Sequence, residues 1–142
     1  MKKILVINGP SINLLGYREI DVYGTKTYLD LIAFIKKVAK ENDLKVKCLQ
    51  TNSEGIIIDK LQDALVKKYD GIIINPGAYT HYSYAIRDAI ASINMRVVEV
   101  HLSDINNRED FRKVNVIKDV CEESFIGKGF DSYKEALEYF CK

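Results

Sequence analysis

Two kinds of hydrophobic pattern alternate along the chain. Five short segments are rich in Val, Ile or Leu, and two of them are apolar at almost every position, as in strands that are covered on both faces. The expected strands are residues 4–8, 45–51, 71–76, 97–103 and 124–129. Longer segments have an apolar side chain at every third or fourth position, which is typical of helices. The expected helices are residues 27–42, 53–68, 81–94 and 132–142.

The helical segments carry local signals for their faces and their ends. In the second of them, Ile57, Leu61 and Leu65 recur every four residues, as on one face of a helix. Ser53 and Ser132 are expected to cap the helices that they begin, because a serine hydroxyl can accept a hydrogen bond from a free N–H of the first turn.

The alternation of strands and helices predicts βαβ units. It therefore predicts one α/β domain over residues 1–142, with a parallel sheet that has helices on both faces. Sheets of this class bind ligands beyond the carboxyl ends of their strands. The polar residues that follow the expected strands include Asn8, Gln50, Asn75, His81, Glu99, His101, Ser103, Arg108 and Arg112. We expect the functional site at this edge, where both histidines of the chain fall.

Composition narrows the functional classes. The 21 basic and 20 acidic residues nearly cancel, which argues against the basic face that non-specific binding of nucleic acid needs. No apolar run approaches the ~20 residues of a membrane span. Two histidines cannot form a His-rich metal site. Cys48, Cys121 and Cys141 have no paired spacing, which indicates reduced thiols in a cytoplasmic protein and disfavours a catalytic cysteine.

Glu99 and His101 are the first candidates for catalysis. They lie two residues apart on an expected strand, so their side chains point to the same face. A carboxylate beside an imidazole orients the ring and favours its cationic form, which is a general acid near neutral pH. A hydrogen-bonded pair with a purely structural role explains the same spacing, and the pair alone does not decide between the two.

The segment NPGAYTH, residues 75–81, is expected to form a tight turn that leads into a helix. Its backbone N–H groups and the positive end of the helix dipole would suit an anionic ligand. An ordinary strand-to-helix turn would have the same composition. Arg87 and Asp88, further along that helix, are typical of a solvated helix face when they are considered by themselves.

The stretch GPSINLLGYREIDVYG, residues 9–24, is longer than the usual connection of about 4–6 residues. A phenol such as that of Tyr23 is a poor base at neutral pH, but a guanidinium such as that of Arg18 favours the phenolate. Opposite a histidine acid, this tyrosine would complete an acid–base pair for an elimination, beneath a lid loop around residues 16–25. Spacing alone favours the simpler alternative, in which the ring packs at the start of the next helix.

Motifs of other familiar chemistries are missing: GxSxG, Walker A, HExxH and GxGxxG do not occur. Four long motifs, in order over nearly the whole chain, resemble instead the type II 3-dehydroquinate dehydratases. They are GPSINLLGYREIDVYG, QTNSEGIIID, NPGAYTHYSYAIRDA and EVHLSDINNREDFR. The resemblance implies a flavodoxin-like three-layer sandwich with strand order 2-1-3-4-5. It also implies a step of the shikimate pathway, in which 3-dehydroquinate loses water by anti elimination through an enolate and gives 3-dehydroshikimate.

The resemblance further implies roles for individual residues. Tyr23 would abstract the proton next to the ketone, and Arg18 would hold Tyr23 as phenolate. His101, paired with Glu99, would protonate the departing hydroxyl. The residues expected to bind substrate are Asn75, His81, Asp88, Leu102, Ser103 and Arg112. Asp88 would be presented to the site of a neighbouring subunit, in a homo-oligomer that is a dodecamer built from trimers. The resemblance implies no metal, nucleotide or other cofactor, and the expected partners are the small-molecule substrate and further copies of this chain.

The chain departs from the family pattern at three positions. Ser11 stands where the family has Asn, and it is expected to retain activity at a reduced rate because a hydroxyl lacks the fixed fork of an amide. Asp104 replaces an Asn and Asn106 replaces a common His, which concerns local loop geometry more than chemistry. Two other classes stay open. One is a weakened ligand-binding or regulatory protein, which Ser11 would favour, and the other is a flavodoxin-like electron carrier, which would bind a flavin.

Overall fold

Five parallel strands form one sheet, in the order β2-β1-β3-β4-β5, in the computed structural model, which describes residues 1–142. The strands are β1 Lys2–Asn8, β2 Leu44–Gln50, β3 Gly71–Asn75, β4 Val97–His101 and β5 Glu123–Ile126. All five overlap the segments that the hydrophobic pattern predicts. The parallel sheet and the flavodoxin-like strand order are therefore confirmed.

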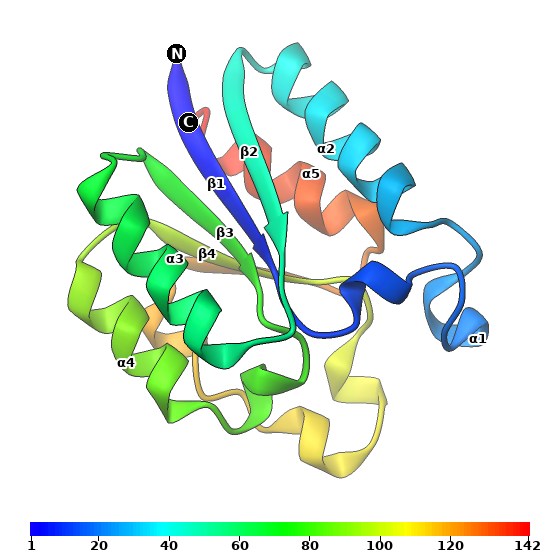
Figure 1. Ribbon diagram of the computed structural model, residues 1–142. Coiled ribbons are helices and arrows are strands. Elements are labelled where there is room, and N and C mark those ends of the chain that lie inside the picture. The colour runs from blue at the N-terminus through cyan, green and yellow to red at the C-terminus, as the bar shows by residue number, and fades with distance from the viewer.

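Helices cover both faces of this sheet (Figure 1). The helices α2 (Tyr28–Glu41) and α5 (Phe130–Tyr139) lie on one face, and α3 (Glu54–Val66) and α4 (Tyr84–Ile93) lie on the other. A short helix, α1 (Ile20–Tyr23), stands in the long connection after β1. The remaining connections contain the 3-10 turns η1 Ile12–Leu14, η2 Gly77–His81, η3 Ile105–Asn107, η4 Asp110–Lys113 and η5 Lys118–Val120. No helix combines the length and the apolar composition that crossing a membrane would take.

The sheet divides the hydrophobic core into two layers, and β1 contributes to both. Ile4 and Val6 pack among the side chains of α2 and α5, whereas Leu5 and Ile7 pack among those of α3 and α4. Successive side chains of a strand point to opposite faces, so a strand with helices on both sides needs apolar residues at every position. This double burial explains why the strand has no polar alternation.

Polar side chains collect where the strands end. Asn8, the last residue of β1, is in register with Gln50 of β2 and with Asn75 of β3. In β4, His101 is the last residue and is in register with Ile126 of β5. The carboxyl ends of the strands therefore form one edge, as the parallel arrangement requires.

Of the two serines expected to cap helices, Ser53 does so and Ser132 does not. Ser53 caps α3, because its hydroxyl accepts a backbone N–H of the first turn. The prediction for Ser132 is wrong, since α5 already begins at Phe130, after Gly129. Ser132 is buried within the first turn, and its hydroxyl accepts the backbone N–H of Lys128 over 3.1 Å. It therefore ties the end of the preceding loop to the helix instead of capping it.

Core packing on α3 leads to a stability prediction. Leu61→Ala should lower the free energy of unfolding by about 2–5 kcal/mol, because Leu61 has no exposed surface and its truncation leaves a cavity. Leu65 belongs to the same four-residue spacing but is 49% exposed, so Leu65→Ala should cost much less. Urea unfolding of both variants beside the parent measures the two costs, and equal losses would contradict this burial pattern.

Candidate active site

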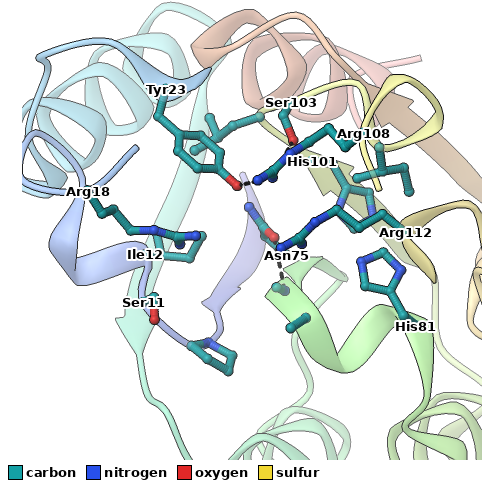
Figure 2. Close-up of a pocket in the computed structure, with 15 residues that line it drawn as sticks. Ser11, Ile12, Arg18, Tyr23, Asn75, His81, His101, Ser103, Arg108 and Arg112 are labelled. Atoms are coloured by element: carbon teal, nitrogen blue, oxygen red, sulfur yellow. Dashed lines mark hydrogen bonds between the residues drawn. The ribbon is translucent and has the colours of Figure 1, made fainter. Parts of the chain in front are cut away.

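A pocket opens at the carboxyl edge of the sheet, between the connections that follow β1, β3 and β4 (Figure 2). Eight of the ten site residues that the resemblance implies line it: Arg18, Tyr23, Asn75, His81, His101, Leu102, Ser103 and Arg112. Glu99 contacts His101 from inside the protein and has no exposed surface. Asp88 is not among the lining residues and lies exposed on α4. The fold thus brings together all but one of the expected residues.

Tyr23 is the last residue of α1, and its hydroxyl contacts a guanidinium to which the sequence assigned no role. Nη1 of Arg108 donates a hydrogen bond to the Tyr23 hydroxyl over 2.7 Å. Arg18, the expected partner, places its guanidinium carbon 4.9 Å from the centroid of the Tyr23 ring and pairs through Nη2 with Glu19. Tyr23 therefore has one cation at its hydroxyl and a second cation over its ring (Figure 2).

Arg108 is held in place by more than Tyr23. Its side chain is only 10% exposed, and its Nη2 lies 3.2 Å from Oε1 of Glu19. Burial works against the charge of this guanidinium, but the neighbouring Tyr23 and Glu19 outweigh it and raise the pKa of Arg108. Arg108 stays cationic beside the phenol. The sequence signals for it were its place after the fourth expected strand and in the fourth motif, four residues before Arg112, and neither gave it a role.

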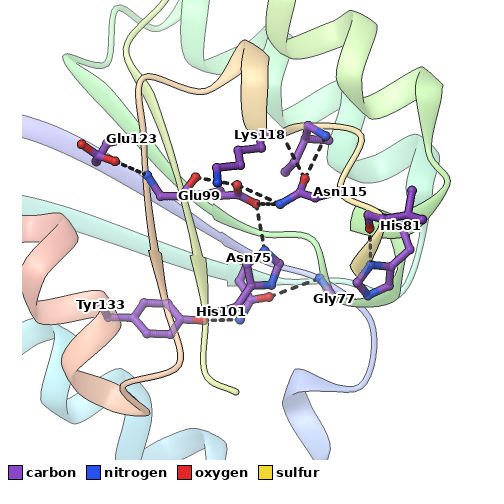
Figure 3. Close-up of polar contacts among 12 residues, drawn as sticks. Asn75, Gly77, His81, Glu99, His101, Asn115, Lys118, Glu123 and Tyr133 are labelled. Carbon is purple, nitrogen blue, oxygen red and sulfur yellow. Dashed lines mark hydrogen bonds and ion pairs between the residues drawn. The ribbon is translucent and has the colours of Figure 1, made fainter. Parts of the chain in front are cut away.

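His101 lies across the pocket from Arg18, with Glu99 behind it (Figures 2 and 3). Nε2 of His101 is 2.8 Å from Oε2 of Glu99, and the two side chains are 5% and 0% exposed. The ring nitrogen Nδ1 is left free of this contact. Burial alone would raise the pKa of the Glu99 carboxyl, but the hydrogen bonds from His101, Ser124 and Asn115 hold that pKa below its ordinary value. Glu99 is therefore an anion at neutral pH.

Asn75 is oriented by a chain of hydrogen bonds below the pocket (Figure 3). The Tyr133 hydroxyl donates to Oδ1 of Asn8 over 2.6 Å and accepts from Nδ2 of Asn75 over 2.9 Å. Oδ1 of Asn75 in turn accepts the backbone N–H of Gly77 over 3.2 Å. Tyr133 has no exposed surface, and the two asparagine side chains are almost as buried. The direction of each bond fixes the amide of Asn75 in one orientation.

His81 and Arg112 form the side of the pocket nearest to η4. Nδ1 of His81 donates to the carbonyl oxygen of Val114 over 2.7 Å, and the ring meets Phe111 edge to face. This bond leaves Nε2 of His81 as a possible ligand contact. Arg112 pairs through Nε with Glu109 over 2.7 Å. Burial is the main reason that the pKa of His81 lies below its ordinary value.

The charge of the lining selects the kind of ligand. Three guanidinium groups, those of Arg18, Arg108 and Arg112, line the pocket, and no carboxylate lines it. Two imidazoles, an amide and two serine residues add hydrogen-bonding groups. Such a lining favours a small anion that also carries hydroxyl or carbonyl groups.

Comparison with known proteins agrees with this geometry. A sequence model of the family described as Dehydroquinase class II matches residues 2–141. The chain belongs to this family. It is 55% identical over 137 residues to a 3-dehydroquinate dehydratase of Caldicellulosiruptor saccharolyticus, with 96% of this chain and 94% of the relative covered. It is 52% identical over 136 residues to a 3-dehydroquinate dehydratase of Clostridium beijerinckii, with 96% and 93% covered.

A solved structure supports the same family membership. The crystal structure of the type II dehydroquinase from Butyrivibrio crossotus matches this chain with a TM-score of 0.97 at 48% sequence identity, covering 99% of this chain and 98% of the other. Nearly the whole chain therefore superposes on the fold of a class II dehydroquinase.

Ser11 is the pocket residue at which this class II dehydroquinase departs from the pattern of its motif. Its backbone is left-handed, with φ 67° and ψ 0°, and its N–H donates to Oδ1 of Asn52 over 3.1 Å. Asparagine adopts this conformation more readily than serine does. The backbone at this position therefore suits the Asn of the motif better than the Ser that is present.

Acid should destabilise this class II dehydroquinase through His81. Because burial lowers the pKa of His81 from 6.5 in the folded state, the unfolded chain binds this proton at higher pH. The free energy of unfolding should therefore fall as the pH drops from about 7 to about 5. His81→Asn keeps a donor for Val114 without a titrating ring, so it should flatten that fall. Urea unfolding across this pH range tests it, and an unchanged slope in the variant would contradict the assignment.

Proposed function

We propose that the protein is a 3-dehydroquinate dehydratase, a hydro-lyase that removes water from 3-dehydroquinate and gives 3-dehydroshikimate in aromatic amino acid biosynthesis. Family membership and relatives of that name at 52–55% identity support this activity. One structural observation carries the proposal: Tyr23 and His101 line the same pocket, and each has a charged partner.

In this mechanism Tyr23 is the base. The guanidinium of Arg108 at its hydroxyl and that of Arg18 over its ring supply positive charge beside the phenolate that acts as the base. The phenolate takes the proton from the carbon next to the ketone of the substrate, and the electrons of the broken C–H bond move into the ketone to form an enolate. Arg18 and Arg108 offset the negative charge that moves from Tyr23 to the substrate.

His101 is the acid of the same mechanism. The enolate electrons form the carbon–carbon double bond and restore the ketone, while the bond to the departing hydroxyl breaks. Nδ1 of His101 gives its proton to that hydroxyl, which leaves as water. Glu99 holds the ring through Nε2 and stabilises the cationic imidazole before the transfer. The reaction ends with a neutral phenol and a neutral imidazole, and exchange of one proton from Tyr23 to His101 through solvent restores the enzyme.

Substrate binding is assigned to the groups around this pair. We infer that Asn75 and the backbone of Leu102 and Ser103 bind the carboxylate and a nearby hydroxyl. His81 and Arg112 bind the ring hydroxyls, for which the free Nε2 of His81 is suited. The catalytic domain spans residues 1–142, with a lid around residues 16–25 that closes over the substrate. Support for the lid comes from Gly16 and Gly24, which have φ of 89° and 77° and can change conformation without a Cβ clash.

Assembly and location are part of the proposal. We infer a homo-oligomer, a dodecamer made of trimers, in which Asp88 reaches the site of a neighbouring subunit. Within its own chain Asp88 lies exposed on α4, and the neighbouring Tyr82 and Tyr84 are 60% and 66% exposed, which offers apolar surface for a subunit contact. A cytoplasmic location is supported by three cysteines that are all free thiols.

The experiment that tests the activity follows the ultraviolet absorbance of the conjugated enone product after 3-dehydroquinate is added to the purified protein. The parent should give a rising signal without added metal or nucleotide. Tyr23→Phe should lower the turnover number by at least about 10², because it removes the base while keeping the ring. No signal from a folded parent would overturn the proposal and leave a binding protein, and an active Tyr23→Phe variant would overturn the role of Tyr23.

Restoring the motif at Ser11 should raise the rate. Ser11→Asn adds an amide that can donate a hydrogen bond with fixed geometry, and Asn suits the left-handed backbone at this position. Loss of one such donor costs about 10²–10³ in turnover where no substitute exists, and the Ser hydroxyl should recover part of it. The turnover number of Ser11→Asn beside the parent measures the difference. A slower Asn variant would show that Ser11 is adapted to this site.

A further inference from the structure

We propose that Ser124 and Asn115 are positioning residues that act through Glu99 to set how readily His101 gives up its proton. Neither side chain lines the pocket, and the motifs assign neither a role. The His101–Glu99 pair alone leaves one oxygen of the Glu99 carboxylate without a hydrogen-bond donor. Ser124 and Asn115 supply donors to that oxygen. Whether Ser124 and Asn115 change the proton affinity of His101 does not depend on the proposed function. Only their influence on the reaction rate rests on that function.

Ser124 reaches Glu99 across the sheet. The two residues are in register as neighbours on β5 and β4, so their side chains stand on the same face. Oγ of Ser124 lies 2.6 Å from Oε1 of Glu99. An ionised carboxylate can only accept, so the hydroxyl must be the donor. A bond of this length is typical of a hydroxyl that donates to a charged oxygen.

Asn115 is aimed at the same carboxylate by its own backbone contacts (Figure 3). Its Oδ1 accepts the N–H groups of Ile117 and Lys118, both over 3.0 Å, at the start of η5. An amide whose oxygen is used in this way must present Nδ2 on the other side. Nδ2 lies 3.0 Å from both oxygens of Glu99. The donor is therefore fixed in place and cannot turn away.

The carboxylate of Glu99 is fully surrounded as a result. Oε1 accepts from Ser124 and Asn115, and Oε2 accepts from His101 and Asn115. Two neutral donors share the negative charge that would otherwise act on the imidazole alone. Each of them makes Glu99 a weaker acceptor toward His101 and disfavours transfer of the shared proton to Glu99. The imidazolium is thereby kept as the proton carrier, and it releases its proton more readily than it would with Glu99 alone.

Other ionisable groups also act on this pair and do not change between the variants proposed below. From the pocket side they are Arg18 and Tyr23 of the connection after β1, His81 of η2, Arg108 of the loop after η3 and Arg112 of η4. From inside the protein the thiol of Cys121 faces Glu99, and burial raises its pKa so far that it stays neutral. A change that appears only when Ser124 loses its hydroxyl is therefore caused by that hydroxyl.

The test is an NMR titration of the two histidines in protein labelled with 15N-histidine, with His81→Asn used to assign the resonances. In Ser124→Ala the titration midpoint of His101 should rise by roughly 0.5–1 pH unit, because Glu99 regains charge toward the ring. In Ser124→Thr, which keeps a hydroxyl and suits a strand, the midpoint should stay close to that of the parent. The midpoint of His81 should move far less than that of His101 in Ser124→Ala, because only the charge of His101 couples the two rings, and it serves as the internal comparison.

Each outcome decides for or against the role of Ser124. A purely structural role predicts a lower free energy of unfolding in Ser124→Ala with no change in the His101 midpoint, and that result would overturn the proposal. A shift in Ser124→Thr as large as in Ser124→Ala would overturn it as well, since the hydroxyl would not be the cause. If the protein catalyses the dehydration, the alkaline limb of its pH–rate profile should move upward in Ser124→Ala by the same amount. An NMR shift without any activity would reject the proposed function and leave this inference standing.

Discussion

A carboxylate without exposed surface is the constraint on which this site depends. An ionised group in such a place is costly unless hydrogen bonds replace the water that it has lost. The side chains that supply them come from β4, from β5 and from the loop before η5, namely His101, Ser124 and Asn115. The need to compensate Glu99 therefore joins three segments of the chain at one point. It fixes the ring of His101 and the turn after Asn115, and it accounts for a serine on β5 at the register position of Glu99.

The proposed acid, His101, and the proposed base, Tyr23, are held by different kinds of interaction. His101 belongs to a central strand and can move only if the sheet is distorted. Tyr23 stands on a short helix outside the sheet, and ion pairs among Arg18, Glu19 and Arg108 hold it over the pocket. The ion pair of Arg18 with Glu19 is partly exposed and contributes little stability, which is compatible with the proposed opening of the lid. A fixed acid and a movable base would suit the proposed enclosed elimination, because substrate must enter before water is excluded.

Sequence reasoning succeeded where the determining interactions are local. Continuous apolar runs reflect strands that are buried on both faces, and apolar side chains at every third or fourth position reflect the buried face of a helix. This is why the sheet and its helices could be predicted. The pairing of Glu99 and His101 also follows from a spacing of two on one strand. By contrast, Arg108 and Tyr23 are separated by 85 positions, and nothing near either residue indicates their bond. Ser132 was misassigned because glycines ahead of it let the helix begin two residues earlier.

Backbone contacts hold the floor of the pocket in place. The side chain at position 11 therefore has little influence on the positions of the other pocket residues. The N–H of Gly9 donates to the carbonyl oxygen of Asn75 over 2.8 Å, which joins the connections after β1 and β3. A Cβ on Gly77, where φ is 59°, would lie 3.1 Å from the carbonyl oxygen of Pro10, and so this turn also needs glycine. Ser11 comes directly after Pro10, and its left-handed backbone lies next to this close contact. A serine at position 11 lacks the side-chain amide of the motif, but its backbone keeps the same place in the turn. We therefore expect the departure to affect one hydrogen-bond donor and to leave the rest of the site unchanged.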